Sequence, residues 1–243
     1  MDLSSINPVL LIASLMVAST PILLAAIGEL VVEKSGVLNL GVEGMMIVGA
    51  ICGFATAVET GSPALGFLAA ALGGAVLASL FGLLTQFLLS NQVATGLALT
   101  LFGLGISALM GQGYVGVRPP SSPRLDLGPL SDLPVVGRIL FSHHPVVYLS
   151  LILVVGVWWF LRATRGGLIV RAVGESHEAA HALGYSVVRV RLLAILFGGA
   201  CAGLGGAFLS LVIVPQWTEG MTAGQGWIAL AIVVFASWRP WRV

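Results

Sequence analysis

The sequence predicts an all-α fold, a polytopic transmembrane helical bundle with about six to seven membrane segments. The chain is 58% hydrophobic and only 9% charged, whereas a soluble domain carries about 25% charged residues. Its apolar residues form continuous runs and do not alternate with polar ones, which favours spanning helices over a β-barrel. Such a chain cannot cover a water-facing surface, so we expect it to lie in lipid.

Six apolar runs approach the roughly 20 residues that cross a bilayer as a helix. They cover residues 8–32, 37–58, 63–89, 93–110, 146–161 and 192–214. A seventh run, 227–238, is too short to span alone. We interpret residues 1–243 as a single transmembrane domain. The chain has no Lys or Arg before Lys34, so no cleavable signal is expected.

The charges predict the orientation of the spans. Two polar connections are long, 111–145 and 162–191, and the second holds five of the eleven Lys and Arg residues. Loops rich in Lys and Arg stay in the cytoplasm. With 162–191 inside, alternating spans place Lys34, Arg162, Arg165, Arg171, Arg189, Arg191, Arg239 and Arg242 inside and only Arg118, Arg124 and Arg138 outside. The N-terminus and the 111–145 loop are then predicted to be external.

The external loop is rich in proline, which disfavours long helices. Its prolines are Pro119, Pro120, Pro123, Pro129, Pro134 and Pro145. The loop is either a plain connector or a docking surface for an external protein.

Small residues recur every four positions in two spans. They are Ala70, Gly74, Ala78 and Gly82 in one span, and Gly199, Gly203 and Ala207 in the other. Such stripes let helix backbones approach closely in lipid. They predict internal packing of a bundle and do not distinguish a transporter from a channel.

The second span begins with an unusual polar stretch. Asn39 and Glu43 are four residues apart and would share one face of a helix. Gly36, Gly41 and Gly44 weaken that helix and indicate a break or a re-entrant start. An ionisable group within a span usually faces a pathway or a partner, so this segment either borders a translocation path or holds a buried structural hydrogen bond. Glu29 is interpreted as an interface residue on the inner face.

Residues 175–184 of the internal loop predict a short amphipathic helix. Acidic residues lie in its first turns, where the helix dipole favours them, and Gly184 can adopt the left-handed cap. Its alanines would let it enter a groove on another protein. The alternative is a surface helix without a partner.

Catalytic, cofactor and metal sites are not predicted. His177 and His181 have helical metal-ligand spacing, but no H-E-x-x-H pattern or nearby cysteine accompanies them. Cys52 and Cys201 are read as packing residues. The sequence contains neither a nucleophile elbow nor a P-loop, so any ATP hydrolysis would require another chain.

Four stretches carry a family resemblance: residues 20–24 (TPILL), 33–46 (EKSGVLNLGVEGMM), 171–184 (RAVGESHEAAHALG) and 220–231 (GMTAGQGWIALA). On these motifs the chain resembles the permease subunits of ATP-binding cassette (ABC) importers in the branched-chain amino acid and ribose group. It is most similar to the nucleoside-type, or simple sugar, subgroup.

The resemblance implies a non-catalytic subunit, without a cofactor, that forms the translocation path for nucleosides or related sugars. Its implied partners are an ABC ATPase, a second homologous permease, an extracytoplasmic substrate-binding protein and membrane lipid, with no nucleic acid. The implied location is multi-pass in the bacterial plasma (inner) membrane. Glu175, Glu178, Ala179, Ala180 and Gly184 would form the ATPase-coupling helix, and Asn39, Glu43 and Thr222 would lie on the translocation path.

The chain departs from the family at its end, because family members continue past residues 238–242 with further spans. A C-terminally truncated chain is therefore expected. Two other functions compete with the permease. An ATPase-independent secondary transporter or channel would require paired ionisable residues within spans and an internal repeat. An intramembrane enzyme would require His, Asp or Ser groups converging from facing spans.

Overall fold

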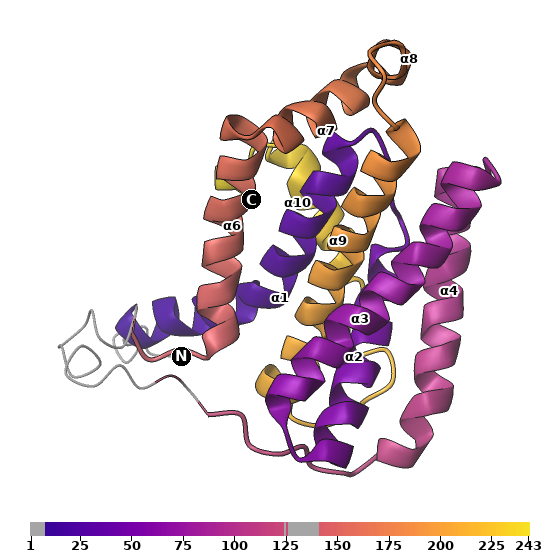
Figure 1. Ribbon diagram of the computed structural model, residues 1–243. Coiled ribbons are helices and arrows are strands. Elements are labelled where there is room, and N and C mark those ends of the chain that lie inside the picture. Colours follow the sequence, from indigo (N-terminus) through magenta and orange to yellow (C-terminus); the bar gives the residue numbers. More distant parts are fainter. Residues whose placement is uncertain (1–7, 124, 126–140) are drawn as a thin grey trace.

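The computed structural model describes residues 8–123, 125 and 141–243, which form a bundle of helices (Figure 1). Six helices in these ranges are long and apolar enough to cross a membrane. They are α1 (Pro8–Lys34), α2 (Val42–Thr60), α3 (Pro63–Gly82) with the π-helix η2 (Leu83–Phe87), α4 (Gln92–Gly111), α6 (Pro145–Ala163), and α9 (Val187–Phe208) with the π-helix η5 (Leu209–Ile213). The predicted all-α polytopic bundle is confirmed.

Shorter helices complete the described part of the chain. They are η3 (Gln112–Tyr114), α7 (Arg165–Glu175), α8 (His177–Ala182), α10 (Gln225–Phe235) and η6 (Pro240–Arg242). Helix α10 corresponds to the seventh apolar run, which was judged too short to span alone. The β pairing in the described residues is limited to an isolated bridge between Val115 and Trp217.

Local signals set several helix ends close to the predicted positions. Pro63 begins α3 after Ser62, whose hydroxyl accepts a hydrogen bond from the backbone N–H of Leu65 at 3.5 Å. Pro145 begins α6 after His144, whose Nδ1 accepts from the backbone N–H of Val146 at 3.2 Å. Proline suits the first position of a helix because its missing N–H would have no partner there.

The prediction for the second span is wrong at its start, because α2 begins at Val42 and not at residue 37. Gly36 has a φ of +82°, and the Asn39 side chain accepts from the backbone N–H of Gly41 at 3.0 Å. Such local side-chain bonds compete with helix formation. The predicted break in this span is confirmed, and residues 35–41 connect α1 to α2 without a helix.

Helix α9 is the centre of the bundle and packs against α1, α2 and α3. The two predicted small-residue stripes meet there. A Cβ added to Gly203 would lie 2.1 Å from the carbonyl oxygen of Ala70, and one added to Gly74 would lie 2.1 Å from that of Gly199. The backbones of α3 and α9 are therefore in direct contact, as the four-residue spacing predicts. We call this contact the α3–α9 seam.

The two ends of the bundle differ in charge. Helices α7 and α8, the C-terminal ends of α1 and α6, and residue 243 lie at one end (Figure 1). The eight basic residues predicted to be internal belong to these segments and to the start of α9. Arg118 belongs to the opposite end, while Arg124, Arg138, Pro129 and Pro134 lie outside the described residues. By the positive-inside rule, we expect the basic end to face the cytoplasm.

His144 is buried at the other end, outside the predicted spans. It is 6% exposed, and the rings of Phe67 and Phe208 lie 5.5 and 5.7 Å from its own, centroid to centroid. Burial lowers the pKa of His144 from 6.5 to about 4. Because Nδ1 accepts from Val146, the neutral ring carries its proton on Nε2, which lies 2.6 Å from the Ser122 hydroxyl.

The close contact at the seam predicts that one added methyl group lowers the stability of the bundle. Gly203→Ala forces the Ala70 backbone away, which we expect to lower the free energy of unfolding by about 1–3 kcal/mol. The measurement is equilibrium unfolding in mixed micelles. Gly156→Ala is the matched control, since a Cβ at Gly156 has no neighbour within 4 Å. Equal stability of the two variants would contradict backbone contact at the seam.

His144 predicts a pH dependence of stability. As the pH falls from 6.5 to about 4, the unfolded chain binds a proton that the folded chain does not. The free energy of unfolding therefore falls across this window. His144→Gln retains a possible acceptor for Val146 and should flatten the decline, measured as thermal unfolding in detergent at several pH values. His181→Gln, on exposed α8, is the control. An unchanged slope in His144→Gln would show that this histidine does not titrate as argued.

Candidate functional site

The side chain of Glu43 joins two helices that begin inside the bundle. Glu43 lies in the first turn of α2 and is 4% exposed. Its Oε1 accepts from the Thr222 hydroxyl at 2.5 Å and from the backbone N–H of Gly224 at 3.0 Å. Its Oε2 accepts from the backbone N–H of Gly226 at 2.7 Å. We call this set of contacts, between residues 39–44 and 222–227, the junction.

The junction lies well below the basic end of the bundle. Helix α10 has 11 residues, so it rises about 16 Å, roughly half of the ~30 Å hydrocarbon core. Beyond its C-terminal end, the Trp238 indole N–H donates to Glu33 near the end of α1. Helix α10 is therefore a half-helix, about half the length needed to cross the core, and it begins inside the bundle, where Thr222 and Gly226 are buried.

Electrostatics explains why an acidic side chain lies at this depth. The first turns of α2 and α10 present unpaired backbone N–H groups and the positive ends of two helix dipoles. The Glu43 carboxylate lies at both ends and accepts three hydrogen bonds. Hydrogen bonds to charged groups contribute about 1.5–3 kcal/mol each, so the carboxylate is stabilised without a basic partner.

Glycines and one carbonyl bring the surrounding segments together. A Cβ on Gly226 would lie 2.7 Å from the Glu43 Cα. A Cβ on Gly44 would lie 2.7 Å from the carbonyl oxygen of Leu99 in α4. The carbonyl of Leu40 accepts from Trp227 Nε1 at 3.2 Å and from the Thr100 hydroxyl at 3.1 Å. Helices α2, α4 and α10 are thus fixed to one another at the junction.

Asn39 and Glu43 do not share a helical face, because Asn39 precedes α2 in the non-helical segment. Asn39 is fully buried and contacts α1. Its backbone N–H and its Nδ2 donate to the two oxygens of Glu29 at 3.3 and 3.4 Å. The interpretation of Glu29 as an interface residue is wrong: it is 1% exposed, because the segment after α1 folds back along that helix and covers it.

Sequence reasoning identified this region in part. Glu29 was not proposed as a site residue, and Thr222 was the one residue singled out from a motif that also contains Gly224 and Gly226. A hydrogen-bonding role for backbone N–H groups leaves no signal in residue type. Thr222, which was proposed, is fully buried and meets Glu43.

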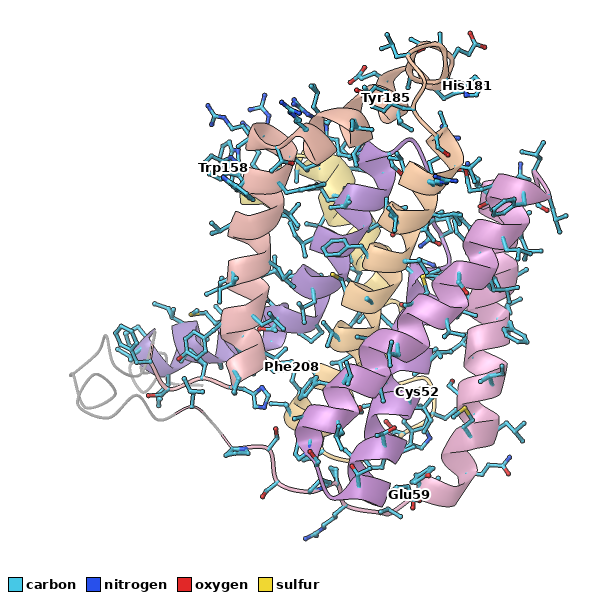
Figure 2. All side chains as sticks on the ribbon, viewed as in Figure 1. Cys52, Glu59, Trp158, His181, Tyr185 and Phe208 are labelled. Carbon is cyan, nitrogen blue, oxygen red and sulfur yellow. The ribbon has the colours of Figure 1, made fainter. Side chains whose placement is uncertain are left out.

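A second candidate site is the arm formed by α7 and α8, which projects from the basic end (Figure 2). Ser176 separates the two helices, and its hydroxyl accepts from the backbone N–H of Ala179 at 3.3 Å. The predicted helix is confirmed but starts later, since Glu175 is the last residue of α7. Gly184 adopts a φ of +87°, as predicted for the left-handed cap.

The surface of α8 is open to an external partner. Ala180 is buried, while Glu178, Ala179 and His181 are exposed. Leu183 is 75% exposed and Tyr185 41% exposed, so apolar side chains extend from the tip of the arm. Figure 2 shows His181 and Tyr185 at this tip, at the opposite end from Glu59. No group of three or more His, Cys, Asp or Glu that could hold a metal is present in the described parts of the chain.

The arm is fixed to the segment that leads to the junction. A Cβ on Gly174 of α7 would lie 2.2 Å from the carbonyl oxygen of Lys34. Arg191 at the start of α9 donates through Nε to the carbonyl of Ser35 at 3.2 Å. Helix α7 and the start of α9 therefore both contact residues 34–36, a few residues before Asn39 and Glu43.

Comparison with known proteins identifies relatives along nearly the whole chain. A putative glucose ABC transporter permease protein of Haloferax volcanii is 45% identical over 230 residues, which are 93% of this chain and 70% of the relative. A guanosine ABC transporter permease protein of Bacillus subtilis is 32% identical, over 99% of this chain and 79% of the relative. A nucleoside ABC transporter permease protein of Lactococcus lactis is also 32% identical, over 95% and 76%.

No solved structure matches the chain. The family model described as the branched-chain amino acid transport system / permease component matches residues 11–243. This range includes the junction, the arm and all of the spans except the first three residues of α1. The chain is therefore a multi-pass membrane protein that belongs to the permease family of ABC transporters.

Proposed function

We propose that this chain forms the translocation path of an ABC importer for nucleosides or related sugars, with ATP hydrolysis on a separate subunit. The substrate class comes from the guanosine, nucleoside and glucose permeases that align with most of the chain. The observation that carries the ATP-driven mechanism is the α7–α8 arm, whose tip is exposed and whose α7 packs against the break between α1 and α2.

The coupling role belongs to α8 and its flanks. Glu175, Glu178, Ala179, Ala180 and Gly184 shape this helix, and the residues that follow its buried Ala180 turn the chain back toward α9. Exposed Leu183 and Tyr185 supply apolar surface for a groove on the ATPase. A six-residue helix with a hydrogen-bonded cap at each end moves as one rigid unit.

The path of force continues from the arm into the membrane. When the ATPases close, α8 and α7 move together, and Gly174 and Arg191 transmit the motion to residues 34–36. The non-helical residues 37–41 then act on Asn39 and the start of α2. Rigid-body motion of this kind exchanges inward and outward access to a site.

The junction borders the translocation path. Asn39, Glu43 and Thr222 are buried and hydrogen-bonded, so they stabilise the protein wall of the path and do not face its interior. Trp227 is 45% exposed, so its indole would face the path. A half-helix that begins beside a break in the chain, as α10 does, is typical of transport sites. The opposite wall is assigned to a second homologous permease, and delivery of substrate at the outer end to an extracytoplasmic binding protein.

If α8 is the coupling helix, substitutions in and next to it should release the ATPase subunit. Wild-type chain, co-expressed with its neighbouring genes and purified in detergent, should retain an ATPase subunit. The double variant Glu178→Arg/Gly184→Arg should lose it, because both changes place bulk and positive charge on the exposed helix.

A matched double variant controls for the strain of replacing a glycine of positive φ. Glu219→Arg/Gly220→Arg also changes an exposed Glu and a glycine of positive φ, +66°, in the loop before α10. It should keep the ATPase. Unchanged co-purification by the Glu178 and Gly184 variant would eliminate the coupling role, and a wild-type chain that takes up substrate without any ATPase would indicate a secondary transporter.

The junction predicts a transport defect without an assembly defect. Glu43→Gln leaves one acceptor oxygen for the donors on residues 222–226, and one backbone N–H loses its charged partner. A loss of about 1.5–3 kcal/mol corresponds to at least tenfold slower uptake. The measurement is uptake of labelled nucleosides and sugars by proteoliposomes that contain the assembled importer.

Thr222→Val should impair uptake in the same direction and less strongly, because the two backbone N–H bonds to Glu43 remain. The control is Glu59→Gln at the outer end, where Glu59 accepts from the Tyr114 hydroxyl at 3.1 Å on the exposed surface. Wild-type uptake by Glu43→Gln, with assembly intact, would assign Glu43 a purely structural role.

A further inference from the structure

A pocket at the basic end lies apart from both the junction and the tip of the arm. It has a volume of about 360 Å³ and is formed where α1, α6, α7 and the segment after α10 meet. Its walls include four basic side chains, Lys34, Arg162, Arg171 and Arg239. Three tryptophans, Trp158, Trp238 and Trp241, complete its lining.

The basic residues of this pocket form no close ion pairs in the described part of the chain. None of the four forms an ion pair with a carboxylate within 4.0 Å among the residues that the structure describes. Arg162 instead lies over the Trp158 ring, with its Cζ 5.5 Å from the ring centroid. Four cations around one concave surface repel one another, and a bound anion would relieve that repulsion.

The position of the pocket is that of a membrane interface. Trp158 and Trp238 are each 39% exposed, and Trp241 is 62% exposed. Tryptophans gather at the headgroup level of bilayers because the indole is apolar with one polar N–H. Figure 2 shows nitrogen-bearing side chains near Trp158, at the top of α6. Below them, α6 exposes Ile152, Val155 and Trp159 as an apolar face toward the acyl chains.

An adjoining pocket of about 280 Å³ adds a hydrogen-bond acceptor. It shares Lys34, Arg171 and Trp238 with the first pocket and also contains Glu33 and Glu175. The Oε2 of Glu33 accepts from the Trp238 indole, while its Oε1 is buried without a hydrogen-bond partner. A buried acceptor is normally satisfied, so this oxygen can receive a donor from a bound molecule.

We propose that these two pockets bind the headgroup of an anionic glycerophospholipid of the cytoplasmic leaflet. The phosphate would lie among Lys34, Arg162, Arg171 and Arg239, a hydroxyl of the headgroup would donate to Glu33, and the acyl chains would follow α6. Basic pockets between membrane helices on the cytoplasmic side suit such headgroups. A lipid is favoured over a protein ligand because the cations adjoin the apolar face of α6 and not the tip of α8.

The test uses native mass spectrometry of the full chain released from nanodiscs of phosphatidylcholine mixed with phosphatidylglycerol. Wild-type chain should retain phosphatidylglycerol in preference to phosphatidylcholine. The variant Arg162→Gln/Arg171→Gln/Arg239→Gln should lower that retention at least tenfold, since each basic residue near an anionic lipid contributes about fivefold in affinity. The matched control, Arg118→Gln/Arg165→Gln/Arg189→Gln, removes the same charge outside the pocket lining and should retain the lipid.

Each alternative ligand gives a different result. Loss of phosphatidylglycerol retention on addition of inorganic phosphate would identify a free-phosphate site and overturn the lipid assignment. Loss of a co-purified ATPase with unchanged phosphatidylglycerol retention would identify a protein contact, which also overturns it. Because Arg239 is exposed, Arg239→Gln alone should keep the fold and reduce retention about fivefold. Equal retention by wild type and Arg239→Gln would exclude that residue from the site. The outcome does not depend on transport activity.

Discussion

The contact between Glu43 and the first turn of α10 is the constraint on which the arrangement of the bundle depends. Helix α10 begins inside the bundle, where its first backbone N–H groups need an acceptor. The Glu43 carboxylate supplies it, because its oxygens accept from Thr222, Gly224 and Gly226 while its own residue lies in the first turn of α2. The start of α10 is thereby fixed to the start of α2.

The same contact connects regions that are far apart in the sequence. Residues 35–41 run from the basic end to the junction, with Asn39 held by Glu29 and Leu40 held by Trp227 and Thr100. The start of this segment touches α7 and Arg191. The arm, the break between α1 and α2, and the half-helix α10 are therefore joined by a continuous series of contacts.

The helices and their packing can largely be predicted from the sequence, whereas the features that depend on backbone geometry cannot. Continuous apolar runs predict all six long helices, and the Gly and Ala spacing of α3 and α9 predicts their contact, because burial and helix periodicity are visible in residue type. The position of Glu29 is not predictable in this way. Its burial results from a non-helical segment that folds back along α1, and local propensity contains no information about that return path.

The junction was predictable only in part, for a related reason. Glu43 and Thr222 are recognisable as polar residues in apolar surroundings, but the other partners of Glu43 are the N–H groups of Gly224 and Gly226, 181 and 183 positions away along the chain. The expectation that Asn39 and Glu43 share a helix face failed because the Asn39 side chain bonds to Gly41 and ends the helical pattern. Short polar side chains that bond their own backbone override periodicity.

The α3–α9 seam has a further consequence for the entropy of folding. Gly and Ala lose no side-chain rotamer freedom on burial, whereas a buried leucine or isoleucine loses about 0.5–1 kcal/mol. The seam is thus assembled from residues that have almost no side-chain rotamer freedom to lose. Its cohesion comes from dispersion between touching backbones, which is short-ranged and is forfeited by gaps of an ångström. Contact at the seam is therefore sensitive to any separation of α3 from α9.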